Sequence, residues 1–294
     1  MKKINLLFIA TFFGLVACNI KGVKNNEVDT KDTTTVVNEE LKGVKDSAYR
    51  NENLLVKTPE VNKLEMDNGI VIKWFEKGTG AKLQDYHAYK IMYEVLLEDG
   101  TVVDGSKIIN RKWVHFLLGF QIQTKGWDIA LRELKIGDFA EISIPSELAR
   151  GKIGIKGLIP PDAKNILKIK VLEEIEPDRI VDGTKVWELA TSKKYADQKA
   201  TENSEIIYDY VVSTPSNPRY VNSHYNGAPY NFHFDDQGIV IGLKKALFGV
   251  SKMDRLWVVV PPDQAYGKKG LLDVIKPNEY VLYDLFIGDV QDLK

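Results

Sequence analysis

Alternating apolar and polar residues recur in short stretches along the chain and predict β-strands. In the segment 89–97 every second residue from Tyr89 to Leu97 is apolar, which is the pattern of a strand with one buried face. The segments 139–144 and 166–172 alternate in the same way. Because such strands bury one face, they predict a sheet that covers something apolar.

A helical stripe lies between these strands. The apolar residues from Trp127 to Leu134 occupy positions i, i+3, i+4 and i+7, so they share one face of a helix. Gly137 follows as a stop signal. The same stripe returns from Leu243 to Val250. An antiparallel sheet packed on one short helix is the α+β arrangement that this order of elements favours.

The chain contains two copies of this pattern. The segment 149–163 aligns without a gap with 265–279, at an offset of 116 residues, and two glycines and a proline recur in register. A repeat of that length indicates duplicated domains rather than a solenoid, whose repeats are usually about 20–50 residues long. We therefore expect two tandem α+β domains, over residues 63–176 and 181–292.

The N-terminus has the pattern of a targeting segment. Two lysines precede an apolar run from Ile4 to Ala17, which is too short to span a bilayer comfortably. Residues 1–17 are therefore predicted to be a signal peptide. The run ends in LVAC, which resembles the bacterial lipoprotein box, where the chain is cut before the cysteine and lipid is attached to it. The lipidated residue would be Cys18, the single cysteine of the chain; an ordinary secretion signal with a chance cysteine is the alternative.

The segment that follows Cys18 is polar and lacks a sustained period. We expect residues 18–62 to be a lipidated cysteine and a disordered tether, with a root-mean-square span of about 35 Å for roughly forty residues. Acyl chains on Cys18 would anchor the protein stably in a membrane. No sorting acid follows the cysteine, so we expect a lipoprotein of the cell envelope, on the outer membrane and facing the periplasm.

Composition adds mainly exclusions. The 40 basic and 41 acidic residues give a net charge of -1, which provides no electrostatic footprint for nucleic acid. Four histidines and one cysteine show no spacing of metal ligands, so we expect neither a metal nor another cofactor. Apolar residues form 44% of the chain, enough for the cores of two domains. The sequence gives no indication of the oligomeric state.

Several spaced motifs carry a resemblance to a known family. LLEDGTVVDGS, then FLLGF with TKGWDIALRELKIGD, then ISIPSELARG with GLIPPDA resemble, in this order and spacing, an FKBP-type peptidyl-prolyl cis-trans isomerase domain. The match covers nearly all of residues 63–176. The second copy is similar more faintly, mostly through VVPPDQAYGKKG. For both copies the resemblance implies a twisted antiparallel sheet of about five strands around a short helix.

The resemblance also implies which residues of the first copy act. Trp127 stands at the indole floor of the family's pocket, Tyr93 on the first pocket strand, and Asp104 beside the reacting carbonyl. Ile159 is a wall residue, and Thr124 stands where a backbone N–H holds the ligand. Trp127 as a plain core residue and Asp104 as a turn acid are the structural alternatives. Buried, Asp104 would need hydrogen bonds, and Tyr93 is the candidate donor.

Other positions of the first copy depart from the family. Val103, Val114 and Leu167 stand where phenylalanine is usual, and Ile155 is at a variable wall position. Arg150 replaces a tyrosine whose hydroxyl usually donates to the ligand. These changes predict a wider, less aromatic pocket. Arg150 is either a contact for an acidic client segment or a solvated surface charge.

The second copy departs in the opposite direction. Leu243 replaces the indole and Val221 replaces the acid, so we expect this domain to be non-catalytic. Its predicted pocket residues are Tyr210, Tyr220, Tyr230, Leu243, Tyr266, Ile275 and Tyr283. Tyrosines suit semi-polar interfaces, so the pocket is predicted to bind a client or partner; a merely packed aromatic core is the alternative.

Two functions remain open at this point. In the first, copy one isomerises prolyl bonds in proline-containing segments of exported proteins, by binding the twisted amide better than the planar one and so lowering a barrier of ~18–20 kcal/mol. Such chemistry needs no nucleophile and no metal. In the second, neither copy catalyses isomerisation, and the lipoprotein is a chaperone or scaffold of an envelope assembly.

Overall fold

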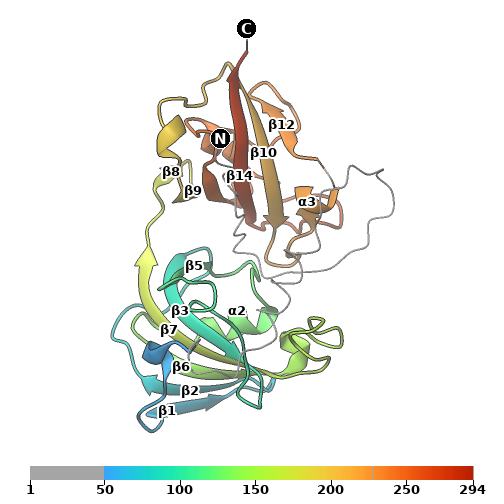
Figure 1. The fold of residues 1–294 in the computed structure, drawn as a ribbon. Coiled ribbons are helices and arrows are strands. Elements are labelled where there is room, and N and C mark those ends of the chain that lie inside the picture. Colours follow the sequence, from blue (N-terminus) through green and yellow to red (C-terminus); the bar gives the residue numbers. More distant parts are fainter. Residues whose placement is uncertain (1–49, 227, 294) are drawn as a thin grey trace, which may run out of the picture.

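The structure is a computed structural model that describes residues 50–226 and 228–293. This part of the chain folds into two domains of one architecture, drawn from blue to the yellow of β7 and from the yellow of β8 to red in Figure 1. The predicted signal peptide, Cys18 and most of the predicted tether lie outside the described residues. Among the described residues no helix is long and apolar enough to cross a membrane.

The first domain is an antiparallel sheet wrapped on one α-helix. The sheet has seven strands in the order β1-β2-β6-β7-β3-β4, and β5 also pairs with β3. Its elements are η2 (Glu52–Leu54), β1 (Asn62–Glu65), β2 (Val71–Glu76), β3 (Ala88–Leu96), β4 (Val102–Gly105), β5 (Val114–Leu117), α2 (Lys125–Leu131), β6 (Phe139–Ile144), η3 (Ser146–Leu148) and β7 (Asn165–Ile175).

The second domain repeats this arrangement. Its seven strands run β11-β10-β14-β13-β9-β8, and β12 pairs with β10. The α+β prediction is therefore confirmed, with seven strands in each sheet where about five were expected. The elements are β8 (Arg179–Val181), β9 (Thr184–Ala190), η4 (Lys193–Tyr195), β10 (Ser204–Ser213), β11 (Val221–Asn222), α3 (Ser223–Asn226), β12 (Tyr230–His233), α4 (Ile241–Leu247), β13 (Arg255–Val260), η5 (Pro262–Gln264) and β14 (Val281–Asp292).

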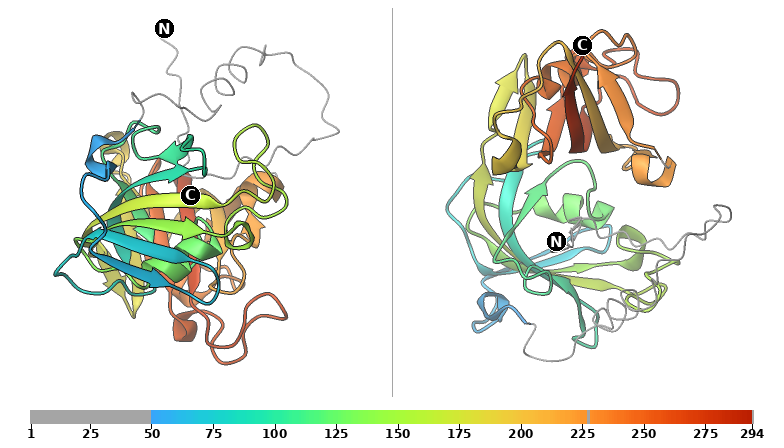
Figure 2. Two further views of the ribbon diagram at one scale, coloured as in Figure 1. Left: turned by 90° about the horizontal axis from the view of Figure 1, so that it is seen from below. Right: turned by 45° about the horizontal axis from the view of Figure 1, so that its top comes forward.

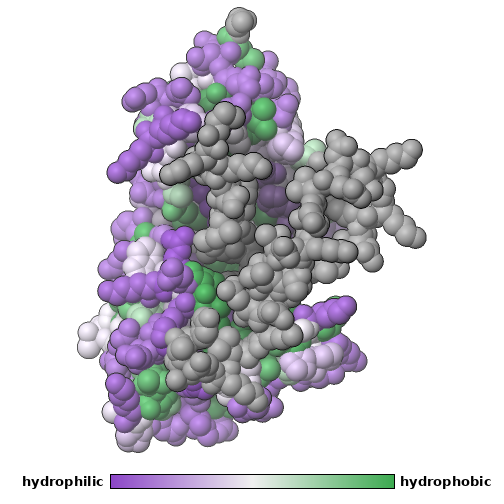
Figure 3. Space-filling view, in the orientation of Figure 1, coloured by the Kyte–Doolittle hydropathy of each residue, from purple (hydrophilic) through white to green (hydrophobic). Residues whose placement is uncertain are grey.

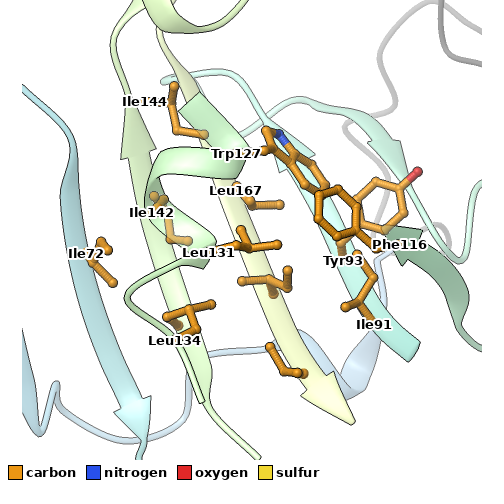
Figure 4. Packing of buried hydrophobic residues seen from close by; sticks show 14 of the residues in the cluster. Ile72, Ile91, Tyr93, Phe116, Trp127, Leu131, Leu134, Ile142, Ile144 and Leu167 are labelled. Atoms are coloured by element: carbon orange, nitrogen blue, oxygen red, sulfur yellow. The ribbon is translucent and has the colours of Figure 1, made fainter. Parts of the chain in front are cut away.

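The core of the first domain lies between α2 and the sheet. Trp127, Leu131 and Leu134 are buried against residues of β3, β6 and β7, as Figure 4 shows. The helix ends at Leu131, and a turn closed by the Leu134 N–H carries the apolar stripe onward. The stripe thus extends beyond the helix that it predicted.

Glycines at the start of both helices allow the helix to approach the sheet. A Cβ on Gly242 would lie 2.5 Å from Cγ1 of Val260 and 2.6 Å from Oγ1 of Thr184. At the matching Gly126, a Cβ would lie 2.8 Å from the Leu148 carbonyl oxygen. Real Cβ atoms do not approach other atoms so closely, so these positions require glycine.

The residues before the first domain are folded onto it. Leu54 is fully buried against Met92 and Phe139. The backbone N–H of Asn51 donates to the Glu94 carboxylate. The prediction of a disordered tether through residue 62 is therefore wrong for residues 51–62. The segment is polar apart from a few side chains, and only tertiary packing shows that one of them, Leu54, is buried.

The two domains share a buried apolar cluster. It joins β3, β5 and the loop after β5 to β9, β13 and β14, through Ala88, Leu117, Phe120, Trp187, Trp257, Val259 and Leu282. Beside it, Tyr86 stacks on Tyr280 with ring centroids 4.1 Å apart, and the Gln121 side chain donates to the Pro215 carbonyl over 2.8 Å. The views of Figure 2 show the second domain seated beside β5 and α2. Packing, and not the linker alone, positions one domain on the other.

The outer face of the second sheet differs from that of the first for this reason. Trp257 and Asp284 match Glu141 and Lys168 at the offset of 116. In the first domain the latter two side chains face each other at 4.0 Å on the face of the sheet opposite the core helix, where Lys168 is buried. In the second domain the same face packs on the neighbouring domain. Figure 3 shows a largely hydrophilic surface with apolar residues visible near this junction.

Candidate active site

Trp127 is held at the start of α2 by two aromatic rings. Its ring centroid lies 5.3 Å from that of Tyr93, in an edge-to-face arrangement, and 5.6 Å from that of Phe116, in a stacked one. Figure 4 shows the three rings together, from α2, β3 and β5. Only 4% of Trp127 is exposed. The indole is therefore fixed in orientation, as the floor of a binding site requires.

Tyr93 and Asp104 form a buried hydrogen-bonded pair beside this indole. The Tyr93 hydroxyl donates to Oδ1 of Asp104 over 3.0 Å, and the Gly105 N–H donates to the same oxygen over 2.6 Å. Burial raises the pKa of Asp104 to about 7, against the opposing effect of these bonds and of Arg150. Burial also raises the pKa of Tyr93. Asp104 therefore stands near the midpoint of its titration in neutral solution.

Arg150 reaches over the site instead of pointing into solvent. Its side chain is partly buried, which lowers its pKa, and the negative charge of Asp104 opposes that effect. Its Nη2 approaches Oε1 of Gln123 at 3.5 Å, a weak hydrogen bond. Arg150 is therefore not fully solvated, and its role as a contact for a client segment stays a prediction.

The remaining predicted residues of the first site are mostly buried. Val103, Ile159 and Leu167 belong to the core cluster that contains Trp127, and Val114 and Ile155 pack against it. Ile155 and Ile159 exchange backbone hydrogen bonds of 2.7 and 2.8 Å across the loop.

Thr124 is the residue before α2 and is 9% exposed. Its hydroxyl is buried without a hydrogen-bond partner among the described residues. The residue that precedes α2 therefore has a buried hydroxyl that no described group satisfies.

The cavity beside Trp127 is small. It has a volume of about 40 Å³ and includes Tyr93, Val114 and Gln123 in its lining, together with Trp257 and Asp284 of the second domain. Such a volume holds a few water molecules. Among the residues predicted for the first site, only Tyr93, Val114 and Trp127 line this cavity, and the second domain forms part of its wall. The wider, less aromatic pocket therefore stays a prediction.

The second domain contains a larger pocket. Its volume is about 230 Å³. The lining includes Tyr208, Tyr210, Val212, Tyr220, Val221, Tyr230, Leu243, Tyr266 and Tyr283. Burial raises the pKa of the tyrosines at 208, 220, 230 and 283, so these phenols are neutral. No aspartate, glutamate, histidine, lysine or arginine lines this pocket among the described residues.

Most of the predicted second-domain residues therefore meet in one pocket. Ile275 is the exception, since it is buried in the core and bonded to Leu271 across the loop. Tyr208 was missed, although it stands two residues before the predicted Tyr210, on the same strand face.

A group of possible metal ligands occurs where the sequence suggested none. His233, Asp235 and Asp236 lie close enough to share an ion. Two of the three already have partners, because the Asp236 carboxylate accepts from the His233 backbone N–H at 3.1 Å and the His233 side chain faces Glu205 at 3.3 Å. Exposed acidic groups of this kind are common, and the group stays a surface feature.

Comparison with known proteins identifies the family. A model of FKBP-type peptidyl-prolyl cis-trans isomerases matches residues 79–172 and 196–287. The chain belongs to this family. Each of its two matched segments is an FKBP domain.

Individual proteins are similar to parts of this chain. The FK506-binding protein of Neisseria meningitidis is 32% identical over 108 residues, which are 37% of this chain and 98% of that protein. Peptidyl-prolyl cis-trans isomerase FKBP10 of Mus musculus is 24% identical over 202 residues, 69% of this chain and 34% of that protein. The chain thus matches about a third of the length of that relative. A crystal structure of the three FKBP domains of wheat FKBP73 aligns with 76% of this chain and 95% of its own chain. The sequence identity is 22% and the TM-score is 0.38.

Some residues of the first FKBP domain's site were not foreseen from the sequence. Phe116 and Gln123 line the cavity from the same domain, and Trp257 and Asp284 line it from the second. One signal was present: the strand 255–260 is apolar on both faces, whereas the matching strand 139–144 alternates. Apolar residues on the second face of a strand indicate that something covers it.

Proposed function

We propose that the first FKBP domain catalyses prolyl cis-trans isomerisation in proline-containing segments of exported proteins. The observation that supports this is the constellation of Trp127, Tyr93 and Asp104. The indole offers a fixed apolar floor for a prolyl ring, and the pair beside it offers a polar group at its edge. A site of this kind lowers the barrier by favouring the twisted, less polar amide over the planar one.

The substrate's own chemistry explains why so few groups suffice. Rotation about the Xaa–Pro bond breaks no covalent bond and transfers no proton, so neither a nucleophile nor a metal is needed. The cavity is too small for a prolyl ring with its flanking peptide units, so binding requires the rim to adjust. Gln123 lines this cavity, and its side chain can move because the hydrogen bond that it accepts from Arg150 is long.

The second FKBP domain is proposed to hold the client or a partner without turnover. Its pocket has the greater volume, but Leu243 stands in place of an indole and Val221 in place of the acid. Neutral tyrosines suit an uncharged peptide segment, because they offer apolar faces and hydroxyl donors to peptide carbonyls.

The decisive experiment is exchange NMR of short Xaa-Pro peptides with the full chain. Trp127→Ala and Leu243→Ala truncate the equivalent helix position in each domain, so each is the other's control. We expect the parent to accelerate exchange, Trp127→Ala to abolish the acceleration and Leu243→Ala to keep it. A well-folded parent that accelerates no Xaa-Pro peptide would contradict the enzyme proposal.

That negative outcome would favour the second candidate, a non-catalytic chaperone or scaffold. The observation on its side is the contrast in volume between about 40 Å³ beside Trp127 and about 230 Å³ in the second domain. Retention of a peptide by the second pocket, lost in Tyr266→Ala and not in Trp127→Ala, would support it.

We also propose that the protein acts in the cell envelope, anchored by lipid to the outer membrane and facing the periplasm. The support is the LVAC sequence that ends the apolar N-terminal run. Metabolic labelling with a palmitate analogue, compared between the parent and Cys18→Ser, tests the anchor. Label in the parent that persists in Cys18→Ser would overturn it.

A further inference from the structure

A second, larger cavity lies between the two domains and adjoins the one beside Trp127. Its volume is about 460 Å³. The two cavities share Val114, His115 and Trp257 in their walls. A peptide with its proline in the cavity beside Trp127 therefore has this cleft as an adjoining space for a neighbouring residue.

The cleft has a floor of aromatic groups from both domains. The His115 ring meets Trp113 edge to face at 5.0 Å and Trp257 at 6.3 Å. The shared apolar cluster beneath Trp257 fixes the distance between the domains. The cleft is therefore a defined cavity of the folded protein.

Its charged residues are all basic. Arg111, Lys112 and Arg255 line the cleft, and no acidic residue does so in the described part of the chain. Arg255 is compensated by Asp284, at 3.2 Å. Arg111 and Lys112 are exposed at the rim and carry the positive charge that a ligand would meet.

The environment of His115 agrees with a positive cleft. Its pKa is lowered, first by burial and then by the charges of Lys90 and Arg111, with a smaller effect from Arg255. Asp178 opposes these effects without reversing them. The histidine is thus held neutral beside the cations.

We propose that this cleft is a subsite for an acidic residue next to the proline of the bound segment. The inference rests on the proposed isomerase site, since that site places the proline. Arg111 and Lys112 are its specificity-determining residues, and Trp257 joins the subsite to the indole floor. A basic cleft that opens from an apolar cavity fits a peptide carrying a carboxylate, by charge complementarity.

The test compares peptides that differ only by Glu or Gln, placed either before or after the proline. The full chain is titrated with each peptide in low and high salt, and both binding and the exchange rate are measured. Arg111→Gln with Lys112→Gln forms the test variant. Lys193→Gln with Lys199→Gln is the matched control, because these two lysines are exposed in the second domain and do not line the cleft.

For one of the two positions, before or after the proline, we expect the parent to bind the Glu peptide about three- to tenfold more tightly than the matching Gln peptide in low salt. In high salt the difference in affinity should be smaller. The preference should vanish in the test variant and persist in the control. If the ratio of the affinities for the Glu and Gln peptides were the same in the parent and the test variant, the subsite would be overturned. Binding to phosphatidylglycerol vesicles through Arg111 and Lys112 without any discrimination between the peptides would overturn it too.

The two readouts separate the subsite from the enzyme proposal. Charge-selective binding without acceleration of exchange supports the subsite and defeats the isomerase. Acceleration that ignores the Glu-to-Gln change defeats the subsite and leaves the isomerase standing.

Discussion

The hydroxyl of Tyr93 donates to the carboxylate of Asp104 over 3.0 Å in a site where both side chains are almost wholly buried. A buried carboxylate is costly when charged, and one phenol and one backbone N–H only partly stabilise it. The pKa of Asp104 consequently rises to about 7. The first domain thus contains a titratable group whose charge changes near neutral pH.

Asp104 should make stability depend on pH. Its folded pKa of about 7 exceeds the ordinary value of 3.8, so between these values the folded protein binds more protons than the unfolded chain. The free energy of unfolding therefore falls as pH rises through this window. Asp104→Asn removes this pH dependence of the free energy of unfolding. The difference in free energy of unfolding, variant minus parent, should therefore rise by as much as ~4 kcal/mol from pH 4 to pH 8.

Urea denaturation of both proteins across that range measures this difference. Asp128, whose pKa burial raises to about 6, titrates in both proteins and cancels from the comparison. A difference between Asp104→Asn and the parent that stays constant with pH would show that Asp104 has an ordinary pKa.

Gly242→Ala should destabilise the second domain although alanine favours helices. The added methyl group would lie 2.5 Å from Cγ1 of Val260, so α4 must move away from β13. We expect a loss of about 1–3 kcal/mol, typical of overpacking. Gly238→Ala is the control, because nothing lies within 4 Å of its Cβ, and it should be nearly neutral. Equal melting temperatures for the two variants would contradict the close packing.

Leu54→Ala should reveal that residues 51–62 are part of the folded domain. Leu54 is fully buried, and its truncation should cost about 2–5 kcal/mol in urea denaturation followed by tryptophan fluorescence. Val61, which is 61% exposed, is the control in the same segment, and Val61→Ala should change stability by less than about 0.5 kcal/mol. If Leu54→Ala proved equally silent, the segment would not be docked in solution.

Tyr86 and Tyr280 should be energetically coupled across the domain junction. Their rings stack at 4.1 Å, so a double-mutant cycle with leucine substitutions should give a coupling of about 0.5–1.5 kcal/mol. Tyr86 and Tyr230, which lie in different domains without a ring contact between them, should show additive effects. Coupling near zero in the first cycle would mean that the domains separate in solution.

Much of the first site could be predicted from the chain because its motifs are local. Trp127 falls on a helical stripe, and Tyr93 and Asp104 lie on strands joined by a short turn, so the connection between them leaves little freedom. The identity of the partner that Tyr93 bonds was predictable for the same reason. In the second domain the same periodicity brought the tyrosines together, with Tyr208 missed and Ile275 placed in the core.

The sequence by itself determined the duplicated α+β architecture, the helix stripes and the residues that face each core, because periodicity states which face of an element is buried. Tertiary structure decided what buries it. Trp257 and Asp284 became part of the first cavity only through packing of one domain on the other, Arg150 became partly buried near Gln123 and Asp104, and Leu54 became core only through its contacts with Met92 and Phe139. Contacts between distant segments depend on shape and distance in space, which no local pattern of residues encodes.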